Sequence, residues 1–516
     1  MKQLLTVFSL FTVMGLQAQN PTWSDDVACI VYSHCTSCHN PNGSGPFSLL
    51  TYSDAVNHAS SIQYKVKSKE MPPWPVNNAY RKFAHDRSLT DQEISTIVQW
   101  VNNSTPQGNI ANAPAQPVYS TSLQIPFPDL KLQIPTYTIP SITEDLYRCF
   151  VLPTGLNVQK FITGIEIIPG NRNIVHHAQV FYDTTGKSSI LDAADPNPGY
   201  TSAGGIGVSS AVLLGTWVPG SRPIFVPNGM GKRLPSSAKI VVQIHYPEYA
   251  SGQVDSSKFN FRFTSNTVRN VSDAAVLNHS SNMVNGPLFI PKNTVKTFRE
   301  EMISPANVSV ISIGPHGHLL CKSLKAFGIT PIGDTIPLID IPEWDFHWQG
   351  FYDFKSPVKI PVGTKLVGIG VYDNTVDNPH NPHSPPQDVS LGEATTDEMM
   401  LFYFSFLLYK NGDENIVVDN LDHGQHHLNC VSNDQSSIAS SQAIELLVYP
   451  NPSNKVLNLS IPNSMSYIIQ VFDAMGRLVL EGNDIKTIDT ESWSKGVYSI
   501  QYSSGDKFGV KTLVVE

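Results

Sequence analysis

The chain has 516 residues, more than a single domain usually contains, so we expect several domains. Its 34 Lys and Arg residues and 43 Asp and Glu residues give a formal net charge of -9, which offers no basic surface for nucleic acid. After residue 18 no segment approaches 18 uninterrupted apolar residues, so we expect an exported, soluble protein with no transmembrane segment.

Residues 1–18 have the composition of a secretory signal peptide. Lys2 precedes an apolar run from Leu4 to Leu16, and the small residue Ala18 stands where a signal peptidase would cleave. The apolar run is too short to remain in the membrane as a span. We therefore expect a mature chain that begins near Gln19.

A haem-attachment motif follows. In Cys35-Thr-Ser-Cys38-His39 the two thiols can reach both vinyl groups of one haem, while the next residue presents an imidazole to the iron. Met71, in the proline-stiffened loop Glu70-Met-Pro-Pro-Trp-Pro75, is the one methionine between residues 20 and 116 and the natural sixth ligand. The pattern predicts one covalently bound haem c; a zinc site or a disulfide pair is the alternative.

The segment Ser88–Val101 predicts the helix that closes this first unit. Thr90 and Glu93 can form a capping box. The helix has one apolar stripe, made by Ile94, Ile97, Val98 and Val101. Residues 19–110 thereby resemble a small, α-helical class I cytochrome c. Its other histidines are expected at the surface or in packing: His34, His58 and His85.

From residue 117 to residue 430 the pattern changes to short apolar runs separated by Pro, Gly and Asn clusters. The clearest runs are 161–168, 239–246, 307–313 and 365–372. Long helical periodicity is absent from this stretch. Short runs of this kind predict an all-β region.

Six residues of the β region form two candidate metal sites. One set consists of His176, His177 and His245; the other consists of His316, His318 and Met399. Imidazole suits both oxidation states of copper, whereas a thioether favours Cu(I). The two sets therefore predict two chemically different copper ions, with oxygen activation at the second set.

The sequence spacing of the histidines within each set determines the direction in which their imidazole rings point. His316 and His318 are two residues apart, so one strand can direct both rings the same way. The neighbours His176 and His177 would point to opposite faces unless they lie at a strand end or a bulge. His245 lies in a β-branched run that predicts a buried strand.

These residues resemble those of the copper type II, ascorbate-dependent monooxygenases, the family of peptidylglycine and dopamine hydroxylases. The motifs, in family order, are Val175-His-His-Ala178, Gln243-Ile-His-Tyr246, Pro315-His-Gly-His-Leu319 and Asp397-Glu-Met-Met400. The resemblance implies two tandem antiparallel jelly-roll (β-sandwich) copper domains, 117–270 and 271–430, with an open, solvent-filled gap between the coppers.

The resemblance also implies a role for each set. The first set would store electrons, and the catalytic set, His316, His318 and Met399, would bind O2 and hydroxylate the substrate. Met400 is the rival ligand, but the family's Glu-Met pair aligns best with Glu398-Met399. Gln243 matches a family position near the path between the coppers, and an ordinary polar role on a strand is equally open.

Several positions limit what the resemblance implies about substrate. Amidating relatives anchor a peptide carboxylate with an arginine where this chain has Gly314, and Leu401 replaces another polar anchor, although Tyr403 persists. A peptide ending in glycine is therefore disfavoured. The aromatic segment Trp344–Trp348 is expected to pack a core or to line a docking face for the cytochrome. Minor metal candidates are His380, His383, His426 and His427.

Residues 431–444 form a linker rich in Ser, Asn, Asp and Gln, and a last unit spans 445–516. Its motifs are Tyr449-Pro-Asn-Pro-Ser453, Val471–Leu478, Gly496–Ile500 and Lys511–Val515. They resemble the C-terminal sorting domain of type IX secretion, a small Ig-like β-sandwich. This implies the type IX machinery as a partner and a secreted or cell-surface location reached through the periplasm. A generic adhesive module is the alternative.

Four cysteines lie outside the haem motif: Cys29, Cys149, Cys321 and Cys430. Export permits disulfide bonds, but the sequence leaves their pairing open. Taken together, the motifs predict a mainly β, secreted copper monooxygenase that hydroxylates a C–H bond of a small molecule or peptide. It would use O2, and an external donor would supply electrons through the fused haem. The alternative is a non-catalytic copper or haem electron-transfer protein.

Overall fold

The computed structural model describes residues 20–41, 43–117, 119, 125, 127–203, 205–418, 446–453, 455–460, 467–473, 478–504 and 507–516. The expected signal peptide, the expected linker, His426, His427 and Cys430 lie outside these residues. The larger of two compact units contains the described residues up to 418, except 125 and 127–128, which group with the smaller unit from 446 onward.

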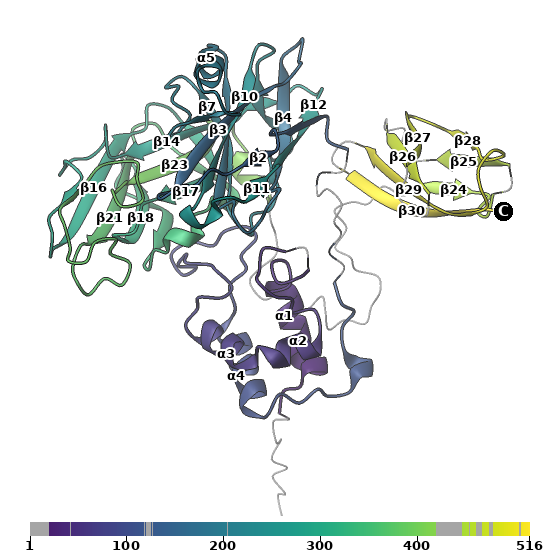
Figure 1. Ribbon diagram of the computed structural model, residues 1–516, viewed down its shortest axis with the longest axis horizontal. Coiled ribbons are helices and arrows are strands. Elements are labelled where there is room, and N and C mark those ends of the chain that lie inside the picture. Colours follow the sequence, from purple (N-terminus) through teal and green to yellow (C-terminus); the bar gives the residue numbers. More distant parts are fainter. Residues whose placement is uncertain are drawn as a thin grey trace, which may run out of the picture. The chain divides into compact units, whose positions relative to one another are not determined.

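The chain opens with a small helical domain (Figure 1). Its elements are η1 (Trp23–Val27), α1 (Ala28–His34), α2 (Tyr52–Asn57), α3 (Ala59–Lys67), α4 (Asp91–Asn102) and η2 (Ile110–Asn112). The capping box at the start of α4 is confirmed, because Thr90 accepts from the Glu93 amide and Glu93 accepts from the Thr90 amide. Ile97 of the predicted stripe is fully buried, and so is Trp100, which lies outside the stripe.

Two sheets follow and form a first sandwich. The elements are β1 (Leu130–Gln133), β2 (Tyr137–Thr138), β3 (Leu146–Pro153), β4 (Lys160–Ile168), β5 (His177–Asp183), α5 (Lys187–Ala194), β6 (Tyr200–Thr201), β7 (Val212–Trp217), β8 (Ile224–Phe225), β9 (Met230–Leu234), β10 (Lys239–Tyr246), η3 (Glu248–Ala250), β11 (Val254–Asp255), β12 (Lys258–Thr264) and β13 (Arg269–Asn270). One sheet has the order β1-β12-β4-β9-β13, with β8 beside β4, and the other has the order β6-β3-β10-β5-β7. Side chains from both sheets, such as Ile162 and Val242, share one core.

A second sandwich is built in the same way. Its elements are β14 (Ser272–Asn278), β15 (Phe289–Ile290), β16 (Val295–Ile303), β17 (Val308–His316), β18 (Cys321–Ile329), β19 (Thr335–Ile341), η4 (Phe346–Trp348), β20 (Tyr352–Ile360), β21 (Lys365–Asp373), β22 (Val389–Ser390), β23 (Leu401–Leu408) and η5 (Asp413–Asn415). The sheets have the orders β14-β23-β17-β20 and β16-β21-β18-β19, and all neighbours within them are antiparallel. All four predicted runs fall on long strands: β4, β10, β17 and β21.

The smaller unit is also β. Its strands are β24 (Leu447–Tyr449), β25 (Val456–Ser460), β26 (Ile468–Phe472), β27 (Leu478–Asn483), β28 (Thr487–Asp489), β29 (Gly496–Ser504) and β30 (Lys507–Val515). They form sheets of order β24-β25-β28 and β27-β26-β29-β30. The prediction of a mainly β chain with a helical first domain is confirmed. Among the described residues, no helix combines the length and the apolar character needed to cross a membrane.

The helical domain is fixed to the second sandwich by the loop that follows Met71. The Asn77 amide donates to the Asp340 carbonyl at 2.9 Å, and the Ala84 amide donates to the Asp353 carbonyl at 2.8 Å. Phe83 is fully buried and stacks on Phe354, with ring centroids 5.3 Å apart. Since Phe83 belongs to the core of the second sandwich, the two domains share hydrophobic packing.

The structure bears on the expected disulfides. Cys149 and Cys321 are buried free thiols, so neither is paired. Cys149 belongs to the first sandwich and Cys321 to the second, where burial raises the pKa of each thiol. Cys29, by contrast, is disulfide-bonded.

The buried carboxyl of Glu300 on β16 predicts that stability falls as pH rises. Glu300 is fully buried, and neither side-chain oxygen has a hydrogen-bond partner among the described residues. Burial raises its pKa to about 8, against about 4.3 in an unfolded chain. The folded state therefore keeps a proton that the unfolded state releases between these values. Stability is highest below the lower value, and falls by up to about 1.4 kcal/mol per pH unit until the upper one.

We expect Glu300→Gln to make the slope shallower by the contribution of Glu300, while the contribution of Glu398, whose pKa burial also raises to about 8, remains. The measurement is the free energy of urea unfolding at several pH values between about 5 and 9. Glu301→Gln is the matched control. That neighbour pairs with Arg299 and Lys365 near the surface, so its substitution should leave the slope unchanged. Equal slopes for the parent and Glu300→Gln would contradict the prediction.

Candidate metal centres

Adjacent strands of the first sandwich bring His176, His177 and His245 together. His177 opens β5 and lies opposite His245 of β10 in the antiparallel register. His176 lies just before β5, and its amide donates to the His245 carbonyl at 3.0 Å. The prediction that the His176-His177 pair sits at a strand end is confirmed, because only there can both rings turn toward one point.

The three rings direct their Nδ1 atoms at each other. The Nδ1 atom of His177 lies 3.4 Å from that of His176 and 3.3 Å from that of His245. Burial lowers the pKa of His176 to about 4 and the pKa of His177 well below its usual value. At neutral pH these two rings are therefore uncharged, and each has one nitrogen lone pair to donate. In the tautomer that carries its proton on Nε2, each Nδ1 lone pair faces the same point, so the set fits a bound metal ion.

Two neighbours orient His245. The ring of Tyr147 stacks on it, with centroids 4.5 Å apart and planes 8° apart. Asp145 Oδ2 lies 3.1 Å from His245 Nε2. Burial alone would raise the pKa of Asp145, but His245 and His176 bring it below its usual value. A carboxylate on the outer nitrogen of a histidine leaves the inner nitrogen free for a metal.

The second sandwich places His316 and His318 at the end of β17. His316 is the last residue of β17, and His318 lies two residues further, so the expectation that both rings leave one strand is wrong. Nδ1 of His316 bonds to the side-chain oxygen of Gln349, and Nδ1 of His318 bonds to the Asp397 carbonyl at 3.1 Å. Both partners are acceptors, so each Nδ1 donates and each Nε2 keeps a lone pair. The ring centroids are 5.1 Å apart.

Glu398 ties Met399 to this turn. Its buried carboxyl accepts from the amides of His318 at 2.9 Å, Leu320 at 2.7 Å and Met399 at 3.0 Å. Burial raises the pKa of Glu398 to about 8, although these bonds favour the ionised form. Tyr372 Oη also donates to the Met399 carbonyl at 2.7 Å. The backbone of Met399 is thereby held beside the two histidines.

The structure separates Met399 from its rival Met400. Met400 is fully buried in the core of the second sandwich, where a Cβ at Gly370 would lie 3.1 Å from its sulfur. Met399 is 8% exposed and does not belong to that core. The Met400 side chain therefore faces the hydrophobic core, whereas Met399 is left as the ligand candidate.

Phe346 of η4 contacts both sets. Its ring stacks on His176, with centroids 5.8 Å apart and planes 20° apart, and meets His318 edge-on at 5.9 Å. Gln349, which also bonds to His316, donates to the Phe346 carbonyl at 2.8 Å. The sequence signal was the aromatic segment Trp344–Trp348, but it did not indicate this location. An aromatic ring therefore stands where the resemblance implies solvent between the two sets.

The haem motif has the form that attachment requires. Cys35 and Cys38 are free thiols. His39 Nδ1 lies 3.1 Å from the Phe47 carbonyl, so it donates and Nε2 is left for iron. Burial lowers the pKa of His39, which favours the neutral ligand form. Met71 is half-buried, and its amide donates to the Lys65 carbonyl at 3.2 Å; its role as sixth ligand stays a prediction.

The structure shows the contacts of Gln243 and of the histidines outside the two sets. His34 is buried between the Arg87 carbonyl at 3.0 Å and Glu93 at 3.2 Å, which confirms a packing role. Gln243 donates to the carbonyls of Ser202 and Gly205, and its place near the path between the coppers stays a prediction. The remaining histidines have other surroundings: His58 stacks on Phe47, His85 and His380 are exposed, and His383 is half-buried. Among the described residues, the first set is the one convergent cluster of His, Cys, Asp or Glu.

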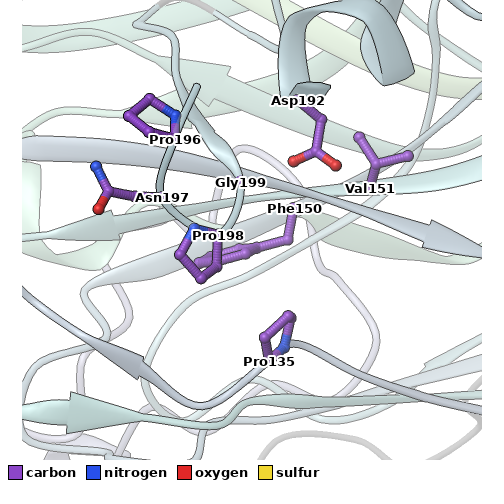
Figure 2. A pocket seen from close by; sticks show the side chains of 8 residues that line it. All are labelled: Pro135, Phe150, Val151, Asp192, Pro196, Asn197, Pro198 and Gly199. Carbon is purple, nitrogen blue, oxygen red and sulfur yellow. The ribbon is translucent and has the colours of Figure 1, made fainter. Parts of the chain in front are cut away.

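A separate cavity of about 320 Å³ lies in the first sandwich. Figure 2 shows its lining, which includes Pro135, Phe150, Asp192 and Pro198. Burial raises the pKa of Asp192. The cavity contains none of the predicted site residues and lends no support to a catalytic role.

Comparisons with known proteins identify the two ends of the chain. Residues 27–105 match the family model of cytochrome c, and residues 447–516 match that of the secretion system C-terminal sorting domain. The chain thus carries a cytochrome c domain and a type IX sorting domain, which indicates secretion to the cell surface or beyond. The predicted haem motif and sorting motifs lie inside these matches.

The chain also has a distant relative among hydroxylases. Over 231 residues the chain is 25% identical to tyramine beta-hydroxylase of Caenorhabditis briggsae, which covers 40% of this chain and 36% of that protein. The chain therefore spans about a third of the length of this curated relative.

The similarity to solved structures is too low to indicate a fold or a function. A beta-glucuronidase of Faecalibacterium prausnitzii has 13% identity and a TM-score of 0.13 over 44% of this chain and 38% of its own. The VP2 particle of infectious bursal disease virus has 9% identity and a TM-score of 0.16 over 55% and 72%.

Proposed function

We propose that the chain is a secreted copper-dependent monooxygenase that hydroxylates a C–H bond of an organic substrate. The observation that carries the proposal is the convergence of the three Nδ1 atoms of His176, His177 and His245. The similarity to a hydroxylase over 40% of the chain supports an oxidoreductase.

The six candidate ligands form two copper sites. His176, His177 and His245 would hold one copper ion, and His316, His318 and Met399 would hold the other. Bound copper supplies one-electron chemistry and binds oxygen species, which imidazole and thioether donors both permit. The overall reaction is R–H + O2 + 2e⁻ + 2H⁺ → R–OH + H2O. Glu398 and Gln349 hold the second set in place, and Phe346 limits the water around it.

The cytochrome domain would supply the electrons. Cys35 and Cys38 would carry the haem through thioether bonds, with His39 and Met71 as axial ligands. One haem passes one electron at a time, so two reductions by an external donor are needed for each product. The fixed contact between the loop after Met71 and the second sandwich supports a permanent donor domain.

The surroundings of His316 support a substrate without an anchored carboxylate. Gly314 stands two residues earlier on the same strand, and a Cβ there would lie 3.0 Å from the Phe351 ring. Phe351 in turn packs near Tyr403, with ring centroids 6.1 Å apart. A side chain at Gly314 would require the Phe351 ring to shift, so in this structure the face offers aromatic carbon in place of a charge.

The experiment that tests the function combines metal analysis with product detection. Purified full-length protein should contain two copper ions and one haem per chain. After reduction, it should be incubated under ¹⁸O2 with a mixture of culture metabolites, and products heavier by one ¹⁸O atom should be sought by mass spectrometry. A protein that binds fewer than two copper ions would refute the assignment.

A second candidate function is electron transfer without substrate chemistry. The ring of Phe346 favours it, because it contacts both sets where substrate would have to approach. Oxygen uptake by the reduced protein discriminates the two functions. Uptake coupled to an oxygenated product supports the enzyme, whereas metal redox cycling without product supports the carrier.

Replacement of Met71 by His should lower the haem reduction potential, because a thioether stabilises ferrous iron more than imidazole does. Turnover driven through the haem by a protein or electrode donor should change, whereas turnover with a small reductant that reaches copper directly should change little. Spectroelectrochemical titration measures the first effect. Unchanged turnover under both regimes, with a lowered potential confirmed, would show that the haem does not limit electron supply.

A further inference from the structure

We infer that electrons leave the haem at its Cys38 edge and reach the first histidine set through the turn at Gly220. The inference rests on the proposed role of the haem as electron donor and adds the route. In each transfer, a ferrous haem loses one electron and becomes ferric, and a cupric ion in the first set becomes cuprous. No bond breaks and no proton is required.

The first observation is the close approach of Gly220 to the haem-attachment sulfur. A Cβ added to Gly220 would lie 3.1 Å from Cys38 Sγ and 3.4 Å from a guanidinium nitrogen of Arg87. Gly220 has φ +83°, a conformation that glycine adopts without strain. Gly229 has φ +79° with nothing within 4 Å of such a Cβ. Of these two glycines, only Gly220 combines a left-handed backbone with contact to the cytochrome domain.

The second observation is the short connection from this turn to His177. The turn is closed by two hydrogen bonds, from the Ser221 amide to the Val218 carbonyl at 2.9 Å and from the Val218 amide to Ser221 Oγ at 3.1 Å. Trp217, the last residue of β7, immediately precedes it. Trp217 lies opposite Ala178 in the ladder between β7 and β5, and Ala178 follows His177.

One through-space contact, from Cys38 Sγ to Gly220, and then the backbone of the turn and the pairing of β7 with β5 link the haem edge to a metal-ligand candidate. Electronic coupling decays less steeply through bonds than through empty space, so this chain of contacts favours transfer. Asn77 and Ala84 fix the cytochrome domain by backbone hydrogen bonds, which keeps the Cys38 edge at the turn. On the Met71 side, Trp74 instead packs against Tyr352 of the second sandwich, with centroids 5.4 Å apart.

The contact is tested in copper-free protein that carries its haem, with Gly220→Asp and Gly220→Asn. Both side chains tolerate left-handed backbone and have nearly the same shape. A carboxylate beside the haem stabilises ferric iron, so Gly220→Asp should have a lower reduction potential than Gly220→Asn. The matched pair Gly229→Asp and Gly229→Asn, at the same backbone conformation, should show no difference. Equal potentials for the Gly220 pair would overturn the contact and the route with it.

The route is tested in copper-loaded, oxygen-free protein. A flash-reduced flavin reduces the haem, and haem absorbance then reports its reoxidation by copper. Gly220→Asn should slow this phase, because its Cβ crowds Cys38 Sγ and lengthens the contact, while Gly229→Asn should match the parent. Haem spectra and copper content verify that each variant is folded.

The outcomes separate the route from the function. Equal reoxidation in Gly220→Asn and Gly229→Asn would overturn the route, while the proposed function would stand. Absence of reoxidation in the parent protein, with the potential shift present, would overturn the donor role in the proposed function and therefore the route as well.

Discussion

Met399→Leu is expected to abolish substrate hydroxylation, whereas Met400→Leu keeps it near the parent rate. The two substitutions are chemically identical and stand at adjacent positions. Leu has nearly the volume of Met, so a swap in a packed core costs less than about 1.5 kcal/mol. The core position of Met400 predicts only this small loss of stability. At Met399, the same swap removes the soft sulfur that favours Cu(I) in the second set.

The measurement is turnover with a fixed substrate, accompanied by copper content, haem absorption and thermal unfolding. Met399→Leu should retain haem and the copper of the first set. Loss of activity in Met400→Leu with an intact Met399→Leu enzyme would reverse the assignment of the ligand. Activity in both variants would show that no thioether is needed and would sink the proposed second site.

The second large effect is expected for His177→Ala, which should bind one copper ion per chain in place of two. The Nδ1 atom of His177 lies within 3.4 Å of both other Nδ1 atoms, so its removal leaves two separated donors. Haem reduction should persist, but reoxidation of the haem by copper should be lost. Copper analysis and haem absorbance after a flash of reduced flavin measure the two effects.

His347→Ala is the matched control for this change. The His347 ring lies 6.3 Å from that of His176, but its Nδ1 lies 2.9 Å from Asp345 and its side chain is 64% exposed. Hydrogen bonding to Asp345 raises the pKa of His347, so it is a poorer metal donor than the buried rings. Two copper ions retained by His177→Ala, or one lost by His347→Ala, would show that the first site has other ligands.

The sequence by itself determined the features that depend on short spacing. The order Cys35, Cys38, His39 fixes two thiols and an imidazole on one turn of chain, and the capping box of Thr90 and Glu93 needs only three residues. Alternating and continuous apolar runs predicted β4, β10, β17 and β21, because a strand buried in a sandwich must present apolar side chains to the core. The family motifs then placed six ligand candidates in chain order.

Only the tertiary structure decided the surroundings of those candidates. His177 and His245 are far apart in the chain and meet through the register of β5 and β10. Neither the ring of Phe346 against both sets nor the approach of Gly220 to Cys38 leaves a pattern in nearby residues. These contacts join segments from different domains, so they depend on how the domains pack. Local spacing specifies which atoms can donate, whereas packing between distant segments decides which atoms meet.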